Sequence, residues 1–329
     1  MKIVIPLAGF GKRLRPHTFT KPKPLINVAG KPVLGHVLDM FAALDNVEEI
    51  IFIVGHLGDQ IEAYVSTAYP WVKASYFEQK ELNGQSPALY LARERLTGPM
   101  LMVFVDTLIE TDLSILKHET ADAVAWVKAV DDPRRFGVAE VGADGCVTRL
   151  IEKPDDVKNN LVVVGFYYFK DGPLLMDCIR EQLQRDIRTK DEYFLADAVN
   201  LMLARGIRMR VQKVEVWQDC GTTETVLETN RYLLDKGCTS APASPADYVV
   251  IPPVNIHPSA HIRRSVIGPY ATVAANCVVE DSVIRDSILD EGAVAQGISA
   301  AQSLIGRNAK VNGRFRTFNV GESSEIGFE

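Results

Sequence analysis

The sequence has few cysteines and no close pair among them. Its five cysteines stand apart, and no C-x-x-C spacing occurs. Because the cysteines are scattered, odd in number and without a C-x-x-C pair, they favour reduced thiols in a cytoplasmic protein over a disulfide framework or a zinc site. No apolar run approaches the ~20 residues that span a bilayer. The net charge of −6 argues against nucleic acid or an anionic membrane as the main partner.

Acidic residues are missing from the first 38 positions, although the whole chain carries more acidic than basic residues. Seven Lys or Arg lie in this stretch. Five of them are grouped around a Gly-containing turn that follows an apolar run: Lys12, Arg13, Arg15, Lys21 and Lys23. Glycine lets backbone approach a phosphate closely, and Lys and Arg neutralise its charge. This arrangement predicts a cradle for a nucleoside triphosphate.

Apolar runs alternate with helical spacings in the first third of the chain. We expect strands at 2–8, 49–54, 72–77 and 100–105, and helices at 32–44, 59–68 and 86–97. Such alternation predicts a Rossmann-like α/β fold with a mixed, mostly parallel sheet, whose ligand lies beyond the carboxyl ends of the strands. Gly9 to Gly11 and Asp106 both follow strands, so we expect them to face one cleft.

The pattern changes from about residue 121. Strands are expected at 123–130, 137–141, 147–152, 161–169 and 207–216, and helices at 173–187 and 194–205. We interpret this part as an inserted lobe that closes the cleft.

A repeat follows the first domain, which we place at 1–235. Residues 236–253 are rich in Pro, Ala and Ser and are expected to form a linker. In the last predicted domain, 254–329, apolar residues recur near every fifth or sixth position: Ile256, Ile262, Ile267, Val273, Val278, Val283 or Ile284, Ile288, Val294, Leu304 and Val311. This period is typical of a parallel β-helix, here of about four coils. Since an open β-helix end exposes strand edges, we expect a homo-oligomer.

The turn near the N-terminus carries a recognisable motif. Residues 7–16 read LAGFGKRLRP, which is neither a Walker loop nor G-x-G-x-x-G. The motif resembles the A-G-x-G-[TS]-R-[LFM]-x-P signature of the sugar-1-phosphate nucleotidylyltransferases. Six further blocks resemble that family's motifs in the same order: Thr20–Leu25 (TKPKPL), Phe104–Thr107, Asp132–Val138, Glu152–Pro154, Val164–Tyr167 and Trp217–Thr222. The resemblance covers about residues 1–230, and the repeat resembles the hexapeptide tails of many members, which implies a left-handed β-helix.

The resemblance implies a Mg²⁺-dependent reaction. An oxygen of a sugar 1-phosphate attacks the α-phosphorus of a nucleoside triphosphate, and pyrophosphate leaves. Two anions must approach each other, so cations must offset their repulsion. Arg13 would hold the triphosphate, and Lys23 would contact the α-phosphate and the attacking phosphate. Together with Asp106 these are the expected catalytic residues, and Asp106 and Asp219 would hold Mg²⁺.

The resemblance also implies two binding sets. The expected nucleotide-binding residues are Leu7, Ala8, Gly9, Gly11, Lys12, Arg13, Gln79 and Gly84, of which Gln79 and Gly84 would read the base. The expected sugar-phosphate-binding residues are Gly137, Glu152, Lys153 and Tyr167. Three departures from the family pattern stand out: Leu7 replaces Ala or Gly, Lys12 replaces Thr or Ser, and Gln85-Ser-Pro replaces the common G-[TL]-A-x-A.

Several functional alternatives stay open. We expect glucose 1-phosphate as the sugar substrate and dTTP or UTP as the nucleotide, with mannose 1-phosphate and GTP as the alternative pair. A bifunctional enzyme would use the β-helix, with His257 or His261, for acetyl transfer. A non-catalytic regulator that senses nucleotide sugars would be expected to lose Arg13, Lys23, Asp106 and Asp219, all of which are present.

Overall fold

The chain forms two compact units. The computed structural model describes residues 1–242, 247–314, 317, 319–323 and 325. One unit comprises Met1–Ile26 and Lys31–Thr229, and the other comprises Asn27–Gly30 and Asn230–Glu329. The predicted boundaries at 235 and 253 stay predictions, and parts of the segments 236–253 and 254–329 lie outside the described residues. None of the described helices has the length and apolar composition needed to cross a membrane.

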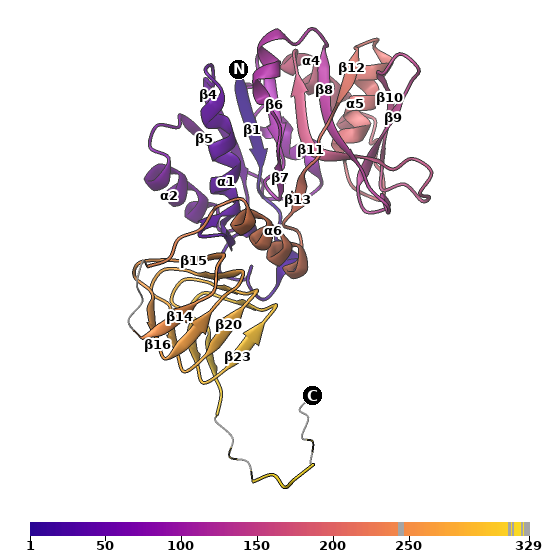
Figure 1. Cartoon of the computed structure of the whole chain (residues 1–329). Coiled ribbons are helices and arrows are strands. Elements are labelled where there is room, and N and C mark those ends of the chain that lie inside the picture. Colours follow the sequence, from indigo (N-terminus) through magenta and orange to yellow (C-terminus); the bar gives the residue numbers. More distant parts are fainter. Residues whose placement is uncertain (243–246, 315–316, 318, 324, 326–329) are drawn as a thin grey trace. The chain divides into compact units, whose positions relative to one another are not determined.

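Nine strands of the first unit form a single sheet (Figure 1). They are β1 (Lys2–Pro6), β4 (Glu49–Val54), β5 (Ala74–Glu78), β6 (Met100–Val103), β8 (Ala123–Ala129), β9 (Gly137–Val141), β10 (Val147–Glu152), β11 (Leu161–Phe169) and β12 (Met209–Lys213). The order is β10-β9-β11-β6-β1-β4-β5, with β8 on β11 and β12 on β8. The strands β10 and β11 run opposite to β1, and the others run with it. The prediction of a mixed, mostly parallel sheet is therefore confirmed.

The expectation of an inserted lobe is wrong. The strands β8 to β12 extend the same sheet, because β11 pairs with β6 and places Phe166 beside Val103. All of β11 after its first residue is buried. A strand that is apolar on both faces needs neighbours on its edges and layers on its faces, so it belongs inside a sheet.

The helices are α1 (Val33–Met40), α2 (Gly58–Ala68), α3 (Gln85–Leu91), α4 (Gly172–Gln184), α5 (Leu195–Ala204) and α6 (Thr223–Asp235). The helix expected over 86–97 ends at Leu91, because the N–H of Ala92 donates to the carbonyl of Leu89 and tight turns follow. The helix α6 was not anticipated. Its buried face contains Thr229 and Asn230, and these polar residues interrupt the apolar period that identifies a helix.

Short elements complete the first part of the chain. They are the 3₁₀ segments η1 (Lys12–Leu14), η2 (Lys23–Leu25), η3 (Phe41–Ala43) and η4 (Leu113–His118), and the strands β2 (Asn27–Val28), β3 (Lys31–Pro32), β7 (Thr107–Ile109) and β13 (Trp217–Asp219). The helix expected over 32–44 is divided into α1 and η3.

The second unit contains a parallel β-helix, built among the described residues from three four-stranded sheets. Its strands are β14 (Tyr248–Val250), β15 (Val254–Ile256), β16 (His261–Arg263), β17 (Ser265–Ile267), β18 (Ala271–Val273), β19 (Val278–Glu280), β20 (Val283–Arg285), β21 (Ile288–Leu289), β22 (Val294–Gln296), β23 (Ser299–Ala301), β24 (Leu304–Ile305) and β25 (Lys310–Asn312). The stacked sheets are consistent with the left-handed β-helix that was expected, and four strands per sheet agree with about four coils.

The inward column shows the stacking directly. Ile256 pairs with Val273, Val273 with Leu289 and Leu289 with Ile305, and all four are buried. A coil therefore takes 17 residues at first and 16 later, less than three full hexapeptides.

Three of the apolar positions expected inside the β-helix are displaced by one residue. The structure buries Val279, Ala295 and Ile305 more deeply than the expected Val278, Val294 and Leu304. Adjacent residues of a strand face opposite sides, and here both are small or apolar. The sequence could not show which one points inward.

The β-helix register can be tested with two neighbours in β20. Ile284 is fully buried, whereas Val283 is 41% exposed. We expect Ile284→Ala to lower the free energy of unfolding by about 2–5 kcal/mol, because it leaves a cavity. Val283→Ala should change it by about 0.5 kcal/mol or less. Denaturant-dependent hydrogen exchange of the β-helix amides measures both, and equal losses would contradict the register.

Candidate functional site

The turn after β1 brings its basic residues to the carboxyl ends of the parallel strands. Gly11 has a φ of 61°, and a side chain there would begin 3.0 Å from the Cβ atom of Lys23. The hydroxyl of Thr18 donates to the carbonyl of Gly11 over 2.9 Å. Glycine is thus required both for the left-handed backbone and for the close approach of Lys23.

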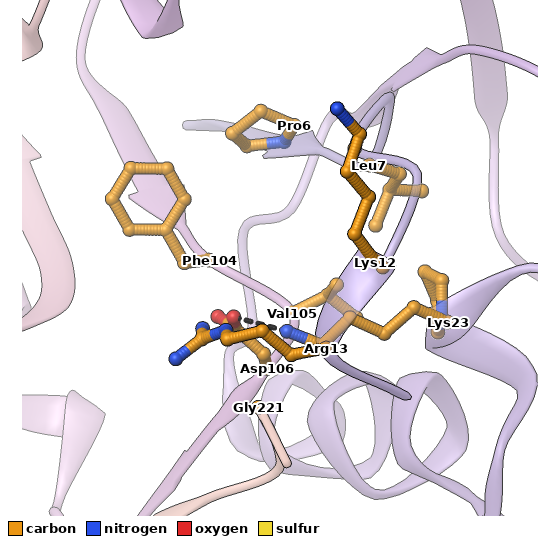
Figure 2. A pocket seen from close by; sticks show the side chains of 12 residues that line it. Pro6, Leu7, Lys12, Arg13, Lys23, Phe104, Val105, Asp106 and Gly221 are labelled. Carbon is orange, nitrogen blue, oxygen red and sulfur yellow. Dashed lines mark hydrogen bonds and ion pairs between the residues drawn. The ribbon is translucent and has the colours of Figure 1, made fainter. Parts of the chain in front are cut away.

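An ion pair joins the two sides of this site. The Nζ atom of Lys23, in η2, lies 2.5 Å from Oδ2 of Asp106, which follows β6 (Figure 2). Burial disfavours the charged carboxylate, but the Lys23 ammonium and the nearby Arg13 outweigh burial and lower the pKa of Asp106. In Figure 2 Arg13 lies beside this pair, whereas Lys12 extends away from Asp106. The carboxylate is therefore held in its charged form.

A second carboxylate and the Arg13 guanidinium meet over Gly221. Strand β13 pairs with β7 so that Asp219 lies beside Thr107, next in sequence to Asp106. A Cβ atom on Gly221 would lie 2.9 Å both from Nη2 of Arg13 and from Oδ1 of Asp219. Burial, followed by the charge of Asp106, raises the pKa of Asp219. Two carboxylates that repel each other in this way form a site that a cation would stabilise.

Two adjoining cavities surround these charges. The first, of about 290 Å³, is lined by seven of the expected residues: Leu7, Gly9, Gly11, Lys12, Arg13, Lys23 and Asp106. The second, of about 250 Å³, is lined by six: Arg13, Asp106, Gly137, Glu152, Tyr167 and Asp219. Arg13 and Asp106 line both, so both cavities open onto the same charges.

Four expected residues line neither cavity. Ala8 is one of them and lies within the turn after β1. Gln79 and Gly84 are two more, and Nε2 of Gln79 donates to the carbonyl of Gly84 over 3.1 Å. Gln79 and Gly84 are thus held together, and their role in reading a base stays a prediction. The Nζ atom of Lys153 lies 4.6 Å from the centre of the Phe194 ring.

The second cavity contains a carboxyl group with an unusual pKa. Glu152, at the end of β10, pairs with Gly137, and a Cβ atom on Gly137 would lie 2.9 Å from its Oε2 atom. Burial is the main reason that the pKa of Glu152 is raised to about 7, with Lys153 opposing the shift and Asp197 adding to it. The missing side chain at Gly137 leaves the carboxyl accessible from the cavity. Such a group can accept hydrogen bonds from ligand hydroxyls.

Some lining residues were given no role from the sequence. Among them are Gln85, Phe104, Arg135 and Gly221. Phe104, Arg135 and Gly221 lie inside blocks that resemble family motifs, and Gln85 belongs to a departure from the family pattern. Their place in these segments was the available signal.

Together the two cavities can bind two anionic ligands side by side. Arg13 and Lys23 supply positive charge, Asp106 and Asp219 supply carboxylates, and the second cavity offers the hydrogen-bonding groups of Glu152 and Tyr167. Cationic side chains and carboxylates that surround one point suit a reaction between two phosphates, because the cations offset the repulsion between the two anions.

Comparisons with known proteins give a consistent result. A family model described as nucleotidyl transferase matches residues 2–236. A glucose-1-phosphate thymidylyltransferase from Streptomyces griseus is 29% identical over 94% of this chain and 93% of its own length. The UTP–glucose-1-phosphate uridylyltransferase AglF from Haloferax volcanii is 29% identical over 72% of this chain and 98% of its own.

A solved structure is similar to the first unit's fold. UDP-glucose pyrophosphorylase complexed with UDP-glucose superimposes with a TM-score of 0.62 at 22% identity, covering 71% of this chain and 98% of that one. At this identity the likeness shows the fold alone.

The raised pKa of Glu152 predicts how stability changes with pH. The folded-state pKa of about 7 exceeds the unfolded value of 4.5, so the unfolded chain loses this proton first as the pH rises. Relative to Glu152→Gln, the wild-type protein should be most stable below pH 4.5 and lose about 1–2 kcal/mol as the pH rises through 7, less than the full shift because the site contacts solvent.

Denaturant titrations at several pH values measure this difference. Glu94→Gln, at an exposed side chain, is the control and should follow the wild type throughout. If the free energies of unfolding of the wild type and of Glu152→Gln changed in parallel with pH, the carboxyl of Glu152 would titrate normally and the prediction would be wrong.

Proposed function

This chain belongs to the nucleotidyl transferase family, and from that premise we propose that it transfers a nucleotidyl group from dTTP or UTP to glucose 1-phosphate. The family membership makes it a sugar-1-phosphate nucleotidyltransferase, with a nucleoside triphosphate and a sugar phosphate as substrates. The products are an NDP-sugar and pyrophosphate. The convergence of Arg13, Lys23, Asp106 and Asp219 is the observation that carries the proposal.

The first cavity is the proposed triphosphate site. Backbone of Gly9 and Gly11 can approach phosphate oxygens closely, and Arg13 can hold the β- and γ-phosphates that leave as pyrophosphate. Lys23 is the proposed contact to both the α-phosphate and the attacking oxygen. In the free protein the ion pair holds the Lys23 ammonium against Asp106, which lines both cavities. A cation fixed there in advance stabilises charge that grows in the transition state.

Asp106 and Asp219 fit a Mg²⁺ ion. Burial is the main cause of the raised pKa of Asp219, and the charge of Asp106 adds to it. A hard cation with oxygen ligands would relieve this repulsion between the two carboxylates. Within the described residues no group of three or more His, Cys, Asp or Glu side chains gathers as a metal site. Mg²⁺ commonly uses one or two carboxylates and takes other ligands from substrate phosphates and water. When bound, it would neutralise phosphate charge during the displacement.

The second cavity is the proposed sugar 1-phosphate site. Glu152 can accept hydrogen bonds from sugar hydroxyls, and Gly137 leaves the space in which a sugar ring could approach its carboxyl. Tyr167 forms part of the wall. A sugar bound here would have its phosphate near Arg13 and Asp106, the charged residues common to both cavities.

The choice of glucose and of a pyrimidine nucleotide rests on the relatives. The relatives described above are named for glucose 1-phosphate with thymidylyl or uridylyl transfer. Gln79, with its amide oriented by Gly84, is the proposed base-reading side chain. A glutamine amide can match the donor and acceptor edge that thymine and uracil share.

A pyrophosphate-release screen tests this function. We expect the wild-type protein with Mg²⁺ to turn over dTTP or UTP with glucose 1-phosphate, and GTP with mannose 1-phosphate much more slowly. Asp106→Asn and Asp219→Asn should each reduce kcat on the order of 10²-fold or more, because they remove a metal carboxylate. Circular dichroism checks that both variants fold. Full activity in both variants would show that Asp106 and Asp219 do not hold a catalytic Mg²⁺ ion.

Lys23→Ala should slow the chemical step. The loss of one preorganised cation predicts a kcat about 10²–10³-fold lower, with a smaller change in KM. Lys158→Ala, which removes an exposed lysine of the same unit, should retain wild-type kinetics. Single-turnover measurements separate chemistry from product release, and an effect of Lys23→Ala on KM alone would contradict the assigned role.

A further inference from the structure

A short segment next to Lys23 belongs to the other unit. Asn27–Gly30 is part of the unit that contains the β-helix, although the chain on either side of it belongs to the first unit. The N–H of Val33 donates to the carbonyl of Ile26 over 3.0 Å and closes the base of this loop. The loop begins four residues after Lys23.

One buried side chain fixes the loop to the β-helix. The Oδ1 atom of Asn230, in α6, accepts hydrogen bonds from the N–H of Ala29 over 2.8 Å and from the hydroxyl of Thr272 over 2.7 Å. Its Nδ2 atom donates to the carbonyl of Tyr270 over 3.3 Å. Asn230 is 1% exposed. One amide therefore joins the loop to strand β18 and to the residue before it.

The loop backbone is adapted to this contact. Ala29 and Gly30 have φ values of 46° and 84°, in the left-handed region. A Cβ atom on Gly30 would lie 2.3 Å from Oδ1 of Asn255 in β15, so the loop also packs directly against the first coil. A non-glycine residue at φ 46° is uncommon, and its neighbours must hold it there.

The chain between Ala29 and Lys23 has little freedom to absorb a displacement. Pro22 and Pro24 flank Lys23 and fix their own φ angles. The N–H of Leu25 donates to the carbonyl of Pro22 over 2.9 Å, and the N–H of Ile26 donates to that of Lys23 over 3.1 Å. A change in where Ala29 is held is therefore passed on to Lys23.

We propose that Asn230 is a positioning residue for the reaction. By holding Ala29 against the β-helix, it fixes the backbone that presents the Lys23 ammonium to Asp106. The C-terminal unit thus takes part in the chemistry, beyond the purely structural role that a repeat of this kind suggests. The inference rests on the proposed function of Lys23 as the cation at the phosphoryl centre.

A double-mutant cycle between Asn230 and Lys23 tests the proposal. Asn230→Ala leaves Ala29 without its partner, and we expect kcat to fall on the order of 10-fold, with KM little changed, because a misplaced group costs most in the transition state. In the Lys23→Ala background, Asn230→Ala should have almost no further effect, since it acts through the missing lysine. A loss that multiplies independently in the two backgrounds would overturn the proposal, as would unchanged kcat in the single variant.

A matched control separates positioning from stability of the β-helix. Ser287 is fully buried in the same unit, where its hydroxyl donates to the carbonyl of Arg285 and accepts from the N–H of Ser303. Both of these partners lie in the β-helix and neither belongs to Asn27–Gly30. Ser287→Ala should weaken the β-helix but keep wild-type kcat. If Asn230→Ala fails to fold, Thr272→Val removes one of the two bonds to Oδ1 and should give a smaller kcat loss with the same non-additivity.

Hydrogen exchange provides a readout that does not need activity. In Asn230→Ala the amides of residues 23–33 should exchange at least ~10-fold faster than in Ser287→Ala, because the loop loses its anchor. Equal exchange in the two variants would refute the anchor. If the wild-type protein turns over no nucleotide and sugar phosphate, the proposed function fails, whereas this comparison still decides whether Asn230 fixes the Lys23 segment.

Discussion

The structure of the site depends on the ion pair between Lys23 and Asp106. Its two atoms lie 2.5 Å apart, and the two residues come from different elements, Lys23 from η2 and Asp106 from the segment after β6. Bringing charges out of water is unfavourable unless each has a partner. The ammonium of Lys23 and the carboxylate of Asp106 therefore each offset the desolvation cost of the other. Arg13 and Asp219 both lie close to Gly221. The site thus holds charges of both signs, and a polyanion with a divalent cation can replace the ion pair of Lys23 with Asp106.

Glycines make these close approaches possible. Gly11 lies against Lys23, Gly221 lies under Arg13 and Asp219, and Gly137 faces the Glu152 carboxyl. A side chain at any of them would collide with a charged group or fill the space beside it. The catalytic geometry therefore depends on where side chains are absent as much as on the charged residues themselves.

Local patterns predicted the mostly parallel arrangement of the first strands, the β-helix and the cluster of basic residues, because each depends on periodicity or on a contiguous motif. They did not predict that β8 to β12 extend the same sheet, since the pairing of β11 with β6 is a long-range contact. The inward register of Val279 and Ile305 was not predictable, since both neighbours in each strand are apolar. Helix α6 was missed for a related reason: Asn230 is buried through hydrogen bonds to Ala29 and Thr272, residues distant in the sequence. Contacts of this kind are decided by tertiary structure. Some residues that line the cavities, such as Gln85 and Arg135, were not expected there. A sequence motif does not show in which direction a side chain points.

A crystal structure with a non-hydrolysable dTTP analogue, glucose 1-phosphate and Mn²⁺ in place of Mg²⁺ would show whether the four charged residues of the site surround one phosphoryl centre. We predict an anomalous Mn²⁺ peak coordinated by Asp106 and Asp219, with the α-phosphate and the sugar phosphate both in contact with Lys23. A metal bound away from these carboxylates, or a triphosphate bound away from Arg13 and Lys23, would contradict it.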